Sequence, residues 1–337
     1  MSSQTERHSI LAPLGIELRT KLALAAIEFF NPRSYTQNCA ISGRTPDLNT
    51  LRPLAAFDFL AYLENKNILQ EPHKYSQRIR HLLEQMASND ILIDMGHGRS
   101  GNVLIPKHYY FLKELTKLQR SGIFWLAPVL GADFIFHYAA PGIVQISGTK
   151  ENGDKHAGTG IVFHPHHILT CRHVVCDMKV DSQQTFQGVE CTIEDSSIHT
   201  HPKLDVAVIH VPQCLQPVAG LAFLSPIIAQ SVFTIGYPRI PFTREPVLTM
   251  QPGAVTSESV TALSGEDLFL YSAIARPGNS GGPVISNEGY IVGIALQDLM
   301  CTDDAFSPHY AGIPSHELAK AVDELGIGVQ IPFERFK

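Results

Sequence analysis

The first part of the chain alternates hydrophobic and polar positions with the period of an α-helix. Apolar residues recur at three- and four-residue spacing over residues 18–29, 51–63 and 75–86, and each run predicts a helix. Two short strands are predicted next, at 91–95 and 102–106, joined by the glycine-rich turn 96–101. A last helix is predicted over 108–120. The front of the chain is therefore expected to be mainly helical.

Beyond residue 137 the pattern changes to short runs of Val, Ile, Leu and Phe, broken by Gly, Pro, Asn and Asp. Such runs are typical of an all-β domain. Only the end departs from it, where Ser315 is expected to cap a helix that carries Leu318, Val322 and Leu325 on one face. The fold class expected is α+β in two domains, 1–137 and 138–337.

Composition agrees with two domains, since 337 residues exceed the usual size of one. The net charge of −6 is unevenly spread. Residues 1–140 hold 15 Lys and Arg against 12 Asp and Glu, whereas residues 141–337 hold 11 against 20. The mildly positive front half allows an anionic partner but does not require one.

The six cysteines show no paired pattern, so we expect reduced thiols in a cytoplasmic protein. The first 20 residues lack a long apolar core, and no signal peptide is expected. No membrane span is expected at 123–136, which contains Pro128, Gly131 and Asp133. A zinc site at Cys171 and Cys176 is not favoured without a CxxC pair, and no metal or organic cofactor is expected.

The peptide Gly-Asn-Ser-Gly-Gly-Pro-Val at 278–284 places one serine among glycines. Glycine permits tight turns and the close approach of a substrate carbonyl, and backbone N–H groups in such a turn can stabilise an oxyanion. Ser280 is therefore the predicted nucleophile, with the N–H groups of Gly278 and Ser280 as oxyanion donors. Taken alone, this peptide also fits a plain hairpin turn.

A histidine and an aspartate precede this serine, each beside a predicted strand. His173 follows the apolar run 168–170, and an imidazole suits a general base at neutral pH. Asp205 opens the alternating run 205–209, where a buried carboxylate needs a partner. The predicted partner is the Nδ1–H group of His173. Five other histidines are expected to be structural: His164, His166, His167, His199 and His201.

In this order the three motifs resemble those of the trypsin/chymotrypsin-like serine proteases, most closely the HtrA-type bacterial branch. The resemblance runs from about residue 141 to the end and includes Gly-Thr-Gly-Ile-Val-Phe at 158–163. It implies two six-stranded antiparallel β-barrels, with His173 and Asp205 from the first, Ser280 from the second, and the active site between them. Too few residues follow Pro314 for the PDZ domain that HtrA-type proteases usually carry, so none is expected.

The resemblance also implies a substrate pocket with Ile274 and Ala275 at its base and Ala295 and Leu296 in one wall. These apolar side chains favour a small or medium hydrophobic residue before the scissile bond. The alternative is a basic residue, if an aspartate of the next segment enters the pocket. The aspartates there are Asp298, Asp303 and Asp304.

The front domain has the element order of a winged helix. Residues on its third helix and hairpin turn could meet DNA phosphates. They are Gln77, Arg78, Arg80, His81, His97 and Arg99. A solvated helix face in a domain used for protein contacts is the alternative, and it is favoured because winged helices often serve as adaptors. A regulatory protein partner is therefore expected, and nucleic acid stays open.

The function expected is a serine endopeptidase acting on protein or peptide substrates, with activity controlled by the front domain. The alternative is a DNA- or protein-binding regulator that uses the barrel for one self-cleavage within residues 139–153. A binding-only barrel with an inert triad is a third reading, against which the intact His173, Asp205 and Ser280 argue.

Overall fold

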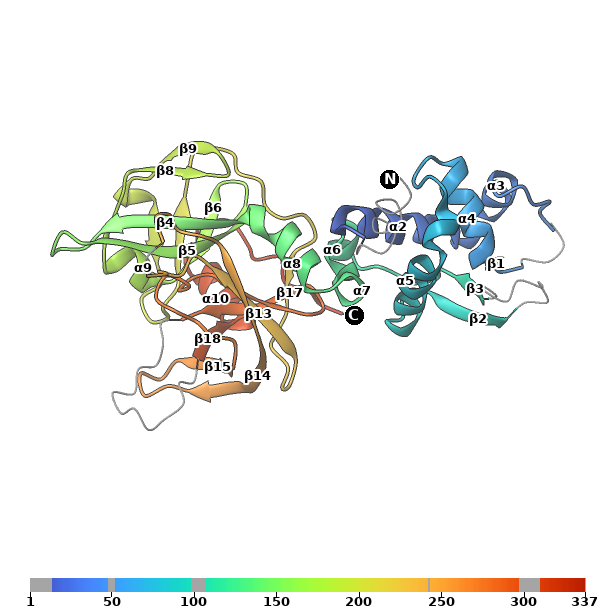
Figure 1. Cartoon of the computed structure of the whole chain (residues 1–337). Helices are drawn as coiled ribbons and strands as arrows, with labels where there is room; N and C mark the ends of the chain where they lie inside the picture. The colour runs from blue at the N-terminus through green and yellow to red at the C-terminus, as the bar shows by residue number, and fades with distance from the viewer. Residues whose placement is uncertain (1–13, 48–51, 98–106, 242, 297–309, 337) are drawn as a thin grey trace. The chain divides into compact units, whose positions relative to one another are not determined.

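The computed structural model describes residues 14–47, 52–97, 107–241, 243–296 and 310–336, which separate into two compact units (Figure 1). The first comprises residues 1–115 and 128–130, the second 116–127 and 131–337. The division falls earlier than the predicted boundary at 137–138. Residues 116–127 belong to the second unit because they contact its later part: Thr116 Oγ1 donates to Glu334 at 2.7 Å, and Gln119 Nε2 donates to the Tyr290 hydroxyl at 2.9 Å.

In its described residues, the first unit joins the α-helices α2 to α5 to a small antiparallel sheet with strand order β1-β3-β2. Phe29, Phe59, Leu83 and Tyr109 are among the side chains buried in its core. Its elements are α2 (Ile16–Phe29), η1 (Pro32–Ser34), α3 (Tyr35–Ile41), β1 (Leu54–Ala55), α4 (Ala56–Asn65), η2 (Pro72–Tyr75), α5 (Ser76–Ser88), β2 (Ile93–His97) and β3 (Lys107–Tyr110).

The strand and the helix predicted after the glycine-rich turn have different outcomes. The strand expected at 102–106 and the turn residue Arg99 lie outside the described residues. The helix expected at 108–120 is wrong: β3 occupies its start, and only α6 (Lys117–Arg120) is helical. The aromatic run at 108–111 favours a strand, and it pairs with β1 and β2. A helix begins only where Thr116 caps it by accepting the Gln119 N–H at 3.2 Å.

A short helical segment leads into the barrels of the second unit. Its elements are η3 (Phe124–Leu126), α7 (Ala127–Leu130), α8 (Ala132–Ala139) and η4 (Ala140–Gly142). The candidate self-cleavage segment at 139–153 therefore begins in a helix and continues in strand β4, and within it only Lys150 and the exposed turn at 151–153 lie outside regular structure. No helix within the described ranges is long and apolar enough to cross a membrane.

The first barrel is a six-stranded sheet with order β10-β11-β6-β5-β4-β7, and β8 and β9 form a separate hairpin. Strand β6 is buried along its whole length, and Ile146, Ile168 and Val208 lie in the core. The elements are β4 (Ile143–Thr149), β5 (Lys155–His164), β6 (His167–Thr170), α9 (Arg172–Cys176), β7 (Lys179–Val180), β8 (Gln183–Phe186), β9 (Val189–Thr192), η5 (Asp195–Ser197), β10 (Ile198–Thr200) and β11 (Ala207–His210).

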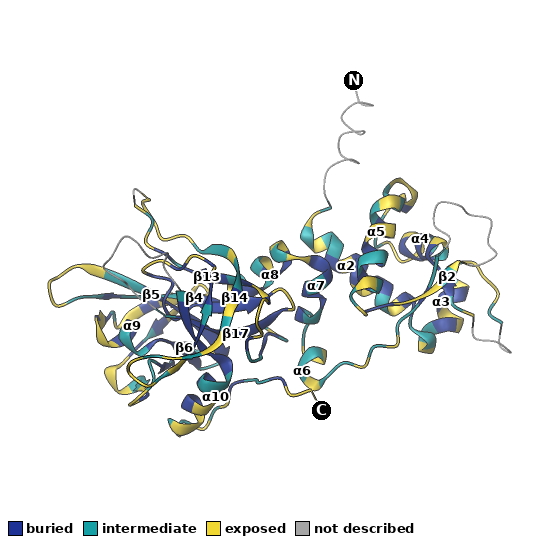
Figure 2. Cartoon of the chain, turned by 90° about the horizontal axis from the view of Figure 1, so that it is seen from below, coloured by how far each residue is buried: buried dark blue, intermediate teal, exposed yellow. Residues whose placement is uncertain are grey.

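The second barrel closes on itself, because β17 pairs with both β16 and β18. Six strands form the closed ring, and β12 adds to β17 in parallel. Figure 2 shows β17 in the colour of buried residues, and each of its positions is buried. The elements are β12 (Ala222–Phe223), β13 (Ser231–Gly236), β14 (Thr249–Thr261), β15 (Asp267–Tyr271), β16 (Pro283–Ser286), β17 (Tyr290–Ala295), β18 (Tyr310–Pro314) and α10 (Ser315–Glu324).

The C-terminal helix α10 is present as expected, but Ser315 does not cap it. Ser315 is the first helical residue, and its buried hydroxyl donates to Ile291 O at 2.6 Å. Leu318 and Val322 are fully buried. The serine therefore fixes the helix to β17 instead of satisfying the free N–H groups at the helix start.

Candidate active site

His173 and Asp205 are brought together at one edge of the first barrel, where strand β6 ends and its neighbour β11 begins. The backbone turns after β6 into the short helix α9, which begins at Arg172, and Asp205 lies just before β11, the neighbour of β6. His173 Nδ1 lies 2.6 Å from Asp205 Oδ2, and the His173 backbone N–H donates to Oδ1 at 2.8 Å. Both carboxylate oxygens are thus occupied, so the carboxylate fixes the ring orientation and favours a proton on Nδ1.

The loop that carries Ser280 packs against the same edge. Ala295 O accepts both the Gly281 N–H at 2.9 Å and the Cys171 Sγ–H at 3.4 Å. Cys171 immediately precedes α9, so this shared acceptor sets Ser280 beside the segment that bears His173. Within the described residues the Ser280 hydroxyl makes no hydrogen bond to His173. Such catalytic hydrogen bonds often tighten only in the substrate complex.

The residues before the serine form a β-turn of type II. Asn279 N–H donates to Arg276 O at 2.9 Å, Pro277 is the second residue, and Gly278 is the third with φ of +101°. A Cβ atom at Gly278 would lie 2.3 Å from the Tyr237 carbonyl oxygen. Glycine is therefore required here both by conformation and by space.

The carbonyl groups of the two central residues of this turn accept hydrogen bonds from the protein. Pro277 O accepts the Arg239 N–H at 2.9 Å, and Gly278 O accepts the Thr159 hydroxyl at 2.7 Å. Because N–H and C=O point to opposite sides of a trans peptide, the Gly278 N–H is directed away from Arg239. Neither this N–H nor that of Ser280 donates to any group in the described part of the chain. The two predicted oxyanion donors are therefore available.

Sequence reasoning missed two threonines that support the nucleophile loop. Thr159 donates its backbone N–H to Ser280 O at 2.9 Å, and its hydroxyl also accepts the Tyr237 N–H at 3.0 Å. Thr170 Oγ1 donates in turn to Thr159 O at 2.7 Å. The two side chains are fully buried. Both threonines lie at positions predicted to be buried, and a buried polar side chain indicates a structural hydrogen bond that the sequence could have suggested.

Cys171, His173 and Asp205 are the one group of three potential metal ligands that lies close together in the described ranges. Burial, and secondarily the charge of Asp205, raises the pKa of the Cys171 thiol well above its usual value. The protonated thiol donates to Ala295 O, whereas a metal would require the thiolate. His173 and Asp205 therefore fit a triad with Ser280 better than they fit a metal site with Cys171. Cys176, the other sulfur considered for zinc, is exposed.

Arg172, the residue before His173, binds the backbone of the segment that precedes Asp205. Its guanidinium donates to the backbone carbonyls of His201 and Pro202 at 3.2 and 3.1 Å. His201 is structural as expected, because its Nδ1 accepts the Leu204 N–H at 2.9 Å and its Nε2 lies 2.9 Å from Glu324. These contacts hold the loop that leads to Asp205.

The four residues proposed for the substrate pocket are in different environments. Ala275 and Ala295 are buried in the apolar cluster of the second barrel. Ile274 is 44% exposed, and Leu296 is half-buried. Thus only Ile274 and Leu296 present substantial surface to a ligand. Asp298, Asp303 and Asp304 lie outside the described residues, so the choice between an apolar and an acidic pocket stays a prediction.

Comparison with known proteins relates the second unit to one family. Residues 158–294 match the model of the trypsin-like peptidase domain. Serine protease Rv3671c of Mycobacterium tuberculosis is 27% identical over 201 residues, which cover 56% of this chain and 48% of that protein. Serine protease Do-like HtrA of Bacillus subtilis is 26% identical over 192 residues, covering 53% and 41%.

Among solved structures, the active form of the Rv3671c protease matches with a TM-score of 0.47 and 20% identity, covering 58% of this chain and 86% of that chain. The chain spans about half the length, or less, of the curated relatives it matches. The matched residues contain the His173, Asp205 and Ser280 motifs in the predicted order. The second unit therefore carries a trypsin-like peptidase domain, homologous to Rv3671c and the HtrA serine proteases.

Proposed function

We propose that the chain is a serine endopeptidase that hydrolyses protein or peptide substrates through Ser280, His173 and Asp205. The observation that carries the proposal is the free pair of N–H groups at Gly278 and Ser280, next to an imidazole bound to a carboxylate at 2.6 Å. Homology to named serine proteases supports the same conclusion.

The mechanism follows from the positions of the donors. His173 Nε2 accepts the Ser280 hydroxyl proton while Oγ attacks the carbonyl carbon of the substrate. The carbonyl oxygen becomes an oxyanion that accepts hydrogen bonds from the N–H groups of Gly278 and Ser280. Each hydrogen bond stabilises the transition state by roughly 3–4 kcal/mol. His173 then protonates the leaving amine, and the C–N bond breaks. Water repeats the sequence on the acyl-enzyme, with Asp205 stabilising the imidazolium in both halves.

Labelling with a fluorophosphonate probe, read by intact mass, tests this proposal. We expect the wild-type protein to gain one probe per chain and Ser280→Ala to gain none. Ser264→Ala serves as the matched control, since Ser264 is exposed in a loop of the same barrel and should label like the wild type. Cleavage of a casein or peptide substrate by Ser280→Ala at the wild-type rate would remove Ser280 from the mechanism.

For the first unit we propose a regulatory role through protein contacts. Its strand and helix order, with the sheet order β1-β3-β2, supports a winged-helix interpretation. Arg80 on α5 is paired with Glu84 at 3.1 Å, which weakens its use for phosphate. Strand β2 lies at the sheet edge, and its Ile93 and Met95 are 45% and 47% exposed. Apolar side chains on an open edge favour a protein partner.

A gel-shift titration separates the two partners. No salt-sensitive shift of duplex DNA should occur at about 0.1 M salt, whereas tight, sequence-dependent binding would favour the DNA-binding alternative.

A cytoplasmic location is proposed on the unpaired cysteines alone, and fractionation of the native host would test it. Self-cleavage predicts one cut of the full chain at 151–153 without turnover of other proteins.

A further inference from the structure

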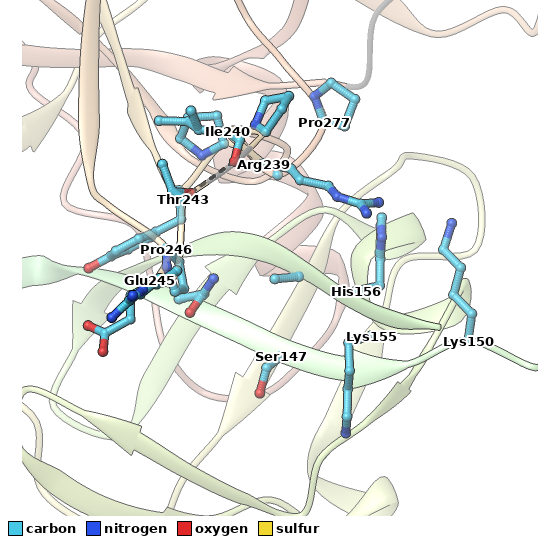
Figure 3. Close-up of a pocket in the computed structure, with 17 residues that line it drawn as sticks. Ser147, Lys150, Lys155, His156, Arg239, Ile240, Thr243, Glu245, Pro246 and Pro277 are labelled. Atoms are coloured by element: carbon cyan, nitrogen blue, oxygen red, sulfur yellow. Dashed lines mark hydrogen bonds between the residues drawn. The ribbon is translucent and has the colours of Figure 1, made fainter. Parts of the chain in front are cut away.

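A cleft of about 660 Å³ opens directly beside the oxyanion turn. One wall comes from β4, β5 and the hairpin turn between them, and the other from the segment that follows β13. Pro277 and Gly278 also line the cleft, and Figure 3 shows Pro277 near Arg239. A ligand in this space is therefore next to Gly278, which supplies one of the two proposed oxyanion donors.

The cleft carries more positive than negative charge, because Lys150, Lys155, Arg239 and Arg244 line it against one carboxylate, that of Glu245. Lys150, His156 and Arg239 line it, and none of their side chains forms an ion pair or hydrogen bond within the part of the chain that the structure describes. Figure 3 shows the Arg239 guanidinium and the Lys150 ammonium directed to the side of the cleft where His156 lies. Lys155 differs, because its ammonium lies 3.7 Å from Asp181 and donates to Thr149 at 3.0 Å.

The electrostatic environment of His156 shows that these charges act on one another. Burial lowers the pKa of His156, and the positive charges of Lys150, His173 and Arg239 lower it further, while only Asp177 opposes them. An anion bound in the cleft would therefore meet the charged side chains of Lys150 and Arg239, with the imidazole of His156 beside them.

We propose that this cleft binds the carboxylate side chain of an Asp or Glu that follows the scissile bond in the substrate. The residues assigned to the pocket for the preceding side chain, 274–275 and 295–296, line none of this cleft. In a peptide that runs from that pocket past Ser280, the residues after the scissile bond therefore lie in the cleft. The inference rests on the proposed function and assigns Lys150, His156 and Arg239 as specificity-determining residues.

Arg239 is the best placed of the three. Its backbone N–H donates to Pro277 O at 2.9 Å, so its position is coupled to the turn that presents Gly278. Its side chain is exposed and able to form a bidentate contact with a carboxylate. Loss of such a charge-assisted contact typically changes a rate constant by about tenfold, and screening should reduce the effect at about 1 M salt.

The test uses a library of peptides amidated at the C-terminus, so that only side-chain carboxylates carry negative charge. Wild-type protein is incubated with the library, and cleaved bonds are identified by mass spectrometry. We expect Asp and Glu to be enriched about tenfold at one or more of the first three positions after the cleaved bond. Arg239→Gln and Lys150→Gln should each reduce that enrichment several-fold, whereas Lys155→Gln, from the same cleft, should leave it unchanged.

A binding experiment keeps this inference separate from the proposed function. Ser280→Ala protein is titrated with fluorescent amidated peptides that differ only in Glu or Gln at the selected position. Tighter binding of the Glu peptide, lost in the double variant with Arg239→Gln, supports the cleft even if the wild type cleaves nothing. Cleavage without acidic enrichment, enrichment unaffected by Arg239→Gln and Lys150→Gln, or equal binding of both peptides would overturn it.

Discussion

His167 makes the stability of the second unit depend on pH in a way that can be calculated. It is 8% exposed on β6, and its Nδ1 lies 3.0 Å from that of His164. Burial lowers the pKa of His167 from 6.5 to about 4, and four neighbouring imidazoles lower it in the same direction. They belong to His164, His166, His199 and His210. No carboxylate is among the groups that act on it.

The sign follows from the protonation of the two states. Between pH 6.5 and pH 4 the unfolded chain binds a proton at His167 that the folded chain does not, so stability falls as the pH falls. One pKa unit corresponds to about 1.4 kcal/mol. For a folded pKa near 4, the loss between pH 7.5 and pH 5 is about 2 kcal/mol, and it approaches 3.4 kcal/mol below pH 4.

Trp125 provides a selective probe, because it is the one tryptophan of the chain and belongs to the same unit as the barrels. Urea unfolding followed by its fluorescence should be measured at pH 7.5 and pH 5 for the wild type and for His167→Gln. The variant removes the titrating group, so its destabilisation relative to the wild type should be about 2 kcal/mol smaller at pH 5 than at pH 7.5. An equal difference at both pH values would refute the reasoning.

Three further substitutions test the site. Asp205→Asn should lower kcat by about 10⁴ in a peptide-cleavage assay, because the amide does not hold the required tautomer of His173; a loss below tenfold would contradict the 2.6 Å contact. Thr159→Val removes the hydroxyl bound to Gly278 O and should slow fluorophosphonate labelling 10- to 100-fold, with Thr261→Val, at the exposed end of β14, as control. Gly281→Ala would bring a Cβ within 2.3 Å of Thr159 O at a φ of +82°, so the free energy of unfolding should fall by several kcal/mol, with a lower urea midpoint and a lower soluble yield; a native midpoint would show that the loop can shift freely.

The contact between His173 and Asp205 and the turn before Ser280 were predictable because each lies in a short motif whose chemistry is local. Ser280 sits in a glycine-rich turn, and His173 and Asp205 flank strands that the hydrophobic pattern marks clearly. The supports of the site were not predictable in this way. Thr159 acts through contacts with Gly278 and Tyr237, which are 119 and 78 residues away. Such contacts depend on how the two barrels dock, and hydrophobic periodicity carries no information about docking.

The wrong helix prediction in the first unit also comes from tertiary contacts that the sequence pattern does not contain. The segment 108–120 contains enough apolar residues to fit a helical period, but its aromatic start has two strands to pair with, and tertiary pairing decided the outcome. The compact units divide before Thr116, earlier than the predicted boundary at 137–138, and the reason is related. Thr116 and Gln119 lie in the segment predicted as the last helix of the front domain, yet their side chains bind Glu334 and Tyr290, 218 and 171 residues further along the chain.

The contacts around Ser280 imply that the active site depends on both barrels together. Thr159 of the first barrel binds Gly278 and Ser280 in the second, and Cys171 binds Ala295. Each barrel has its own apolar core, but neither alone holds the oxyanion turn in place. A perturbation that loosens the docking of the barrels therefore removes the free N–H pair before it disrupts either core. Reactivity of Ser280 toward a phosphonate should accordingly be lost at a lower urea concentration than the secondary structure.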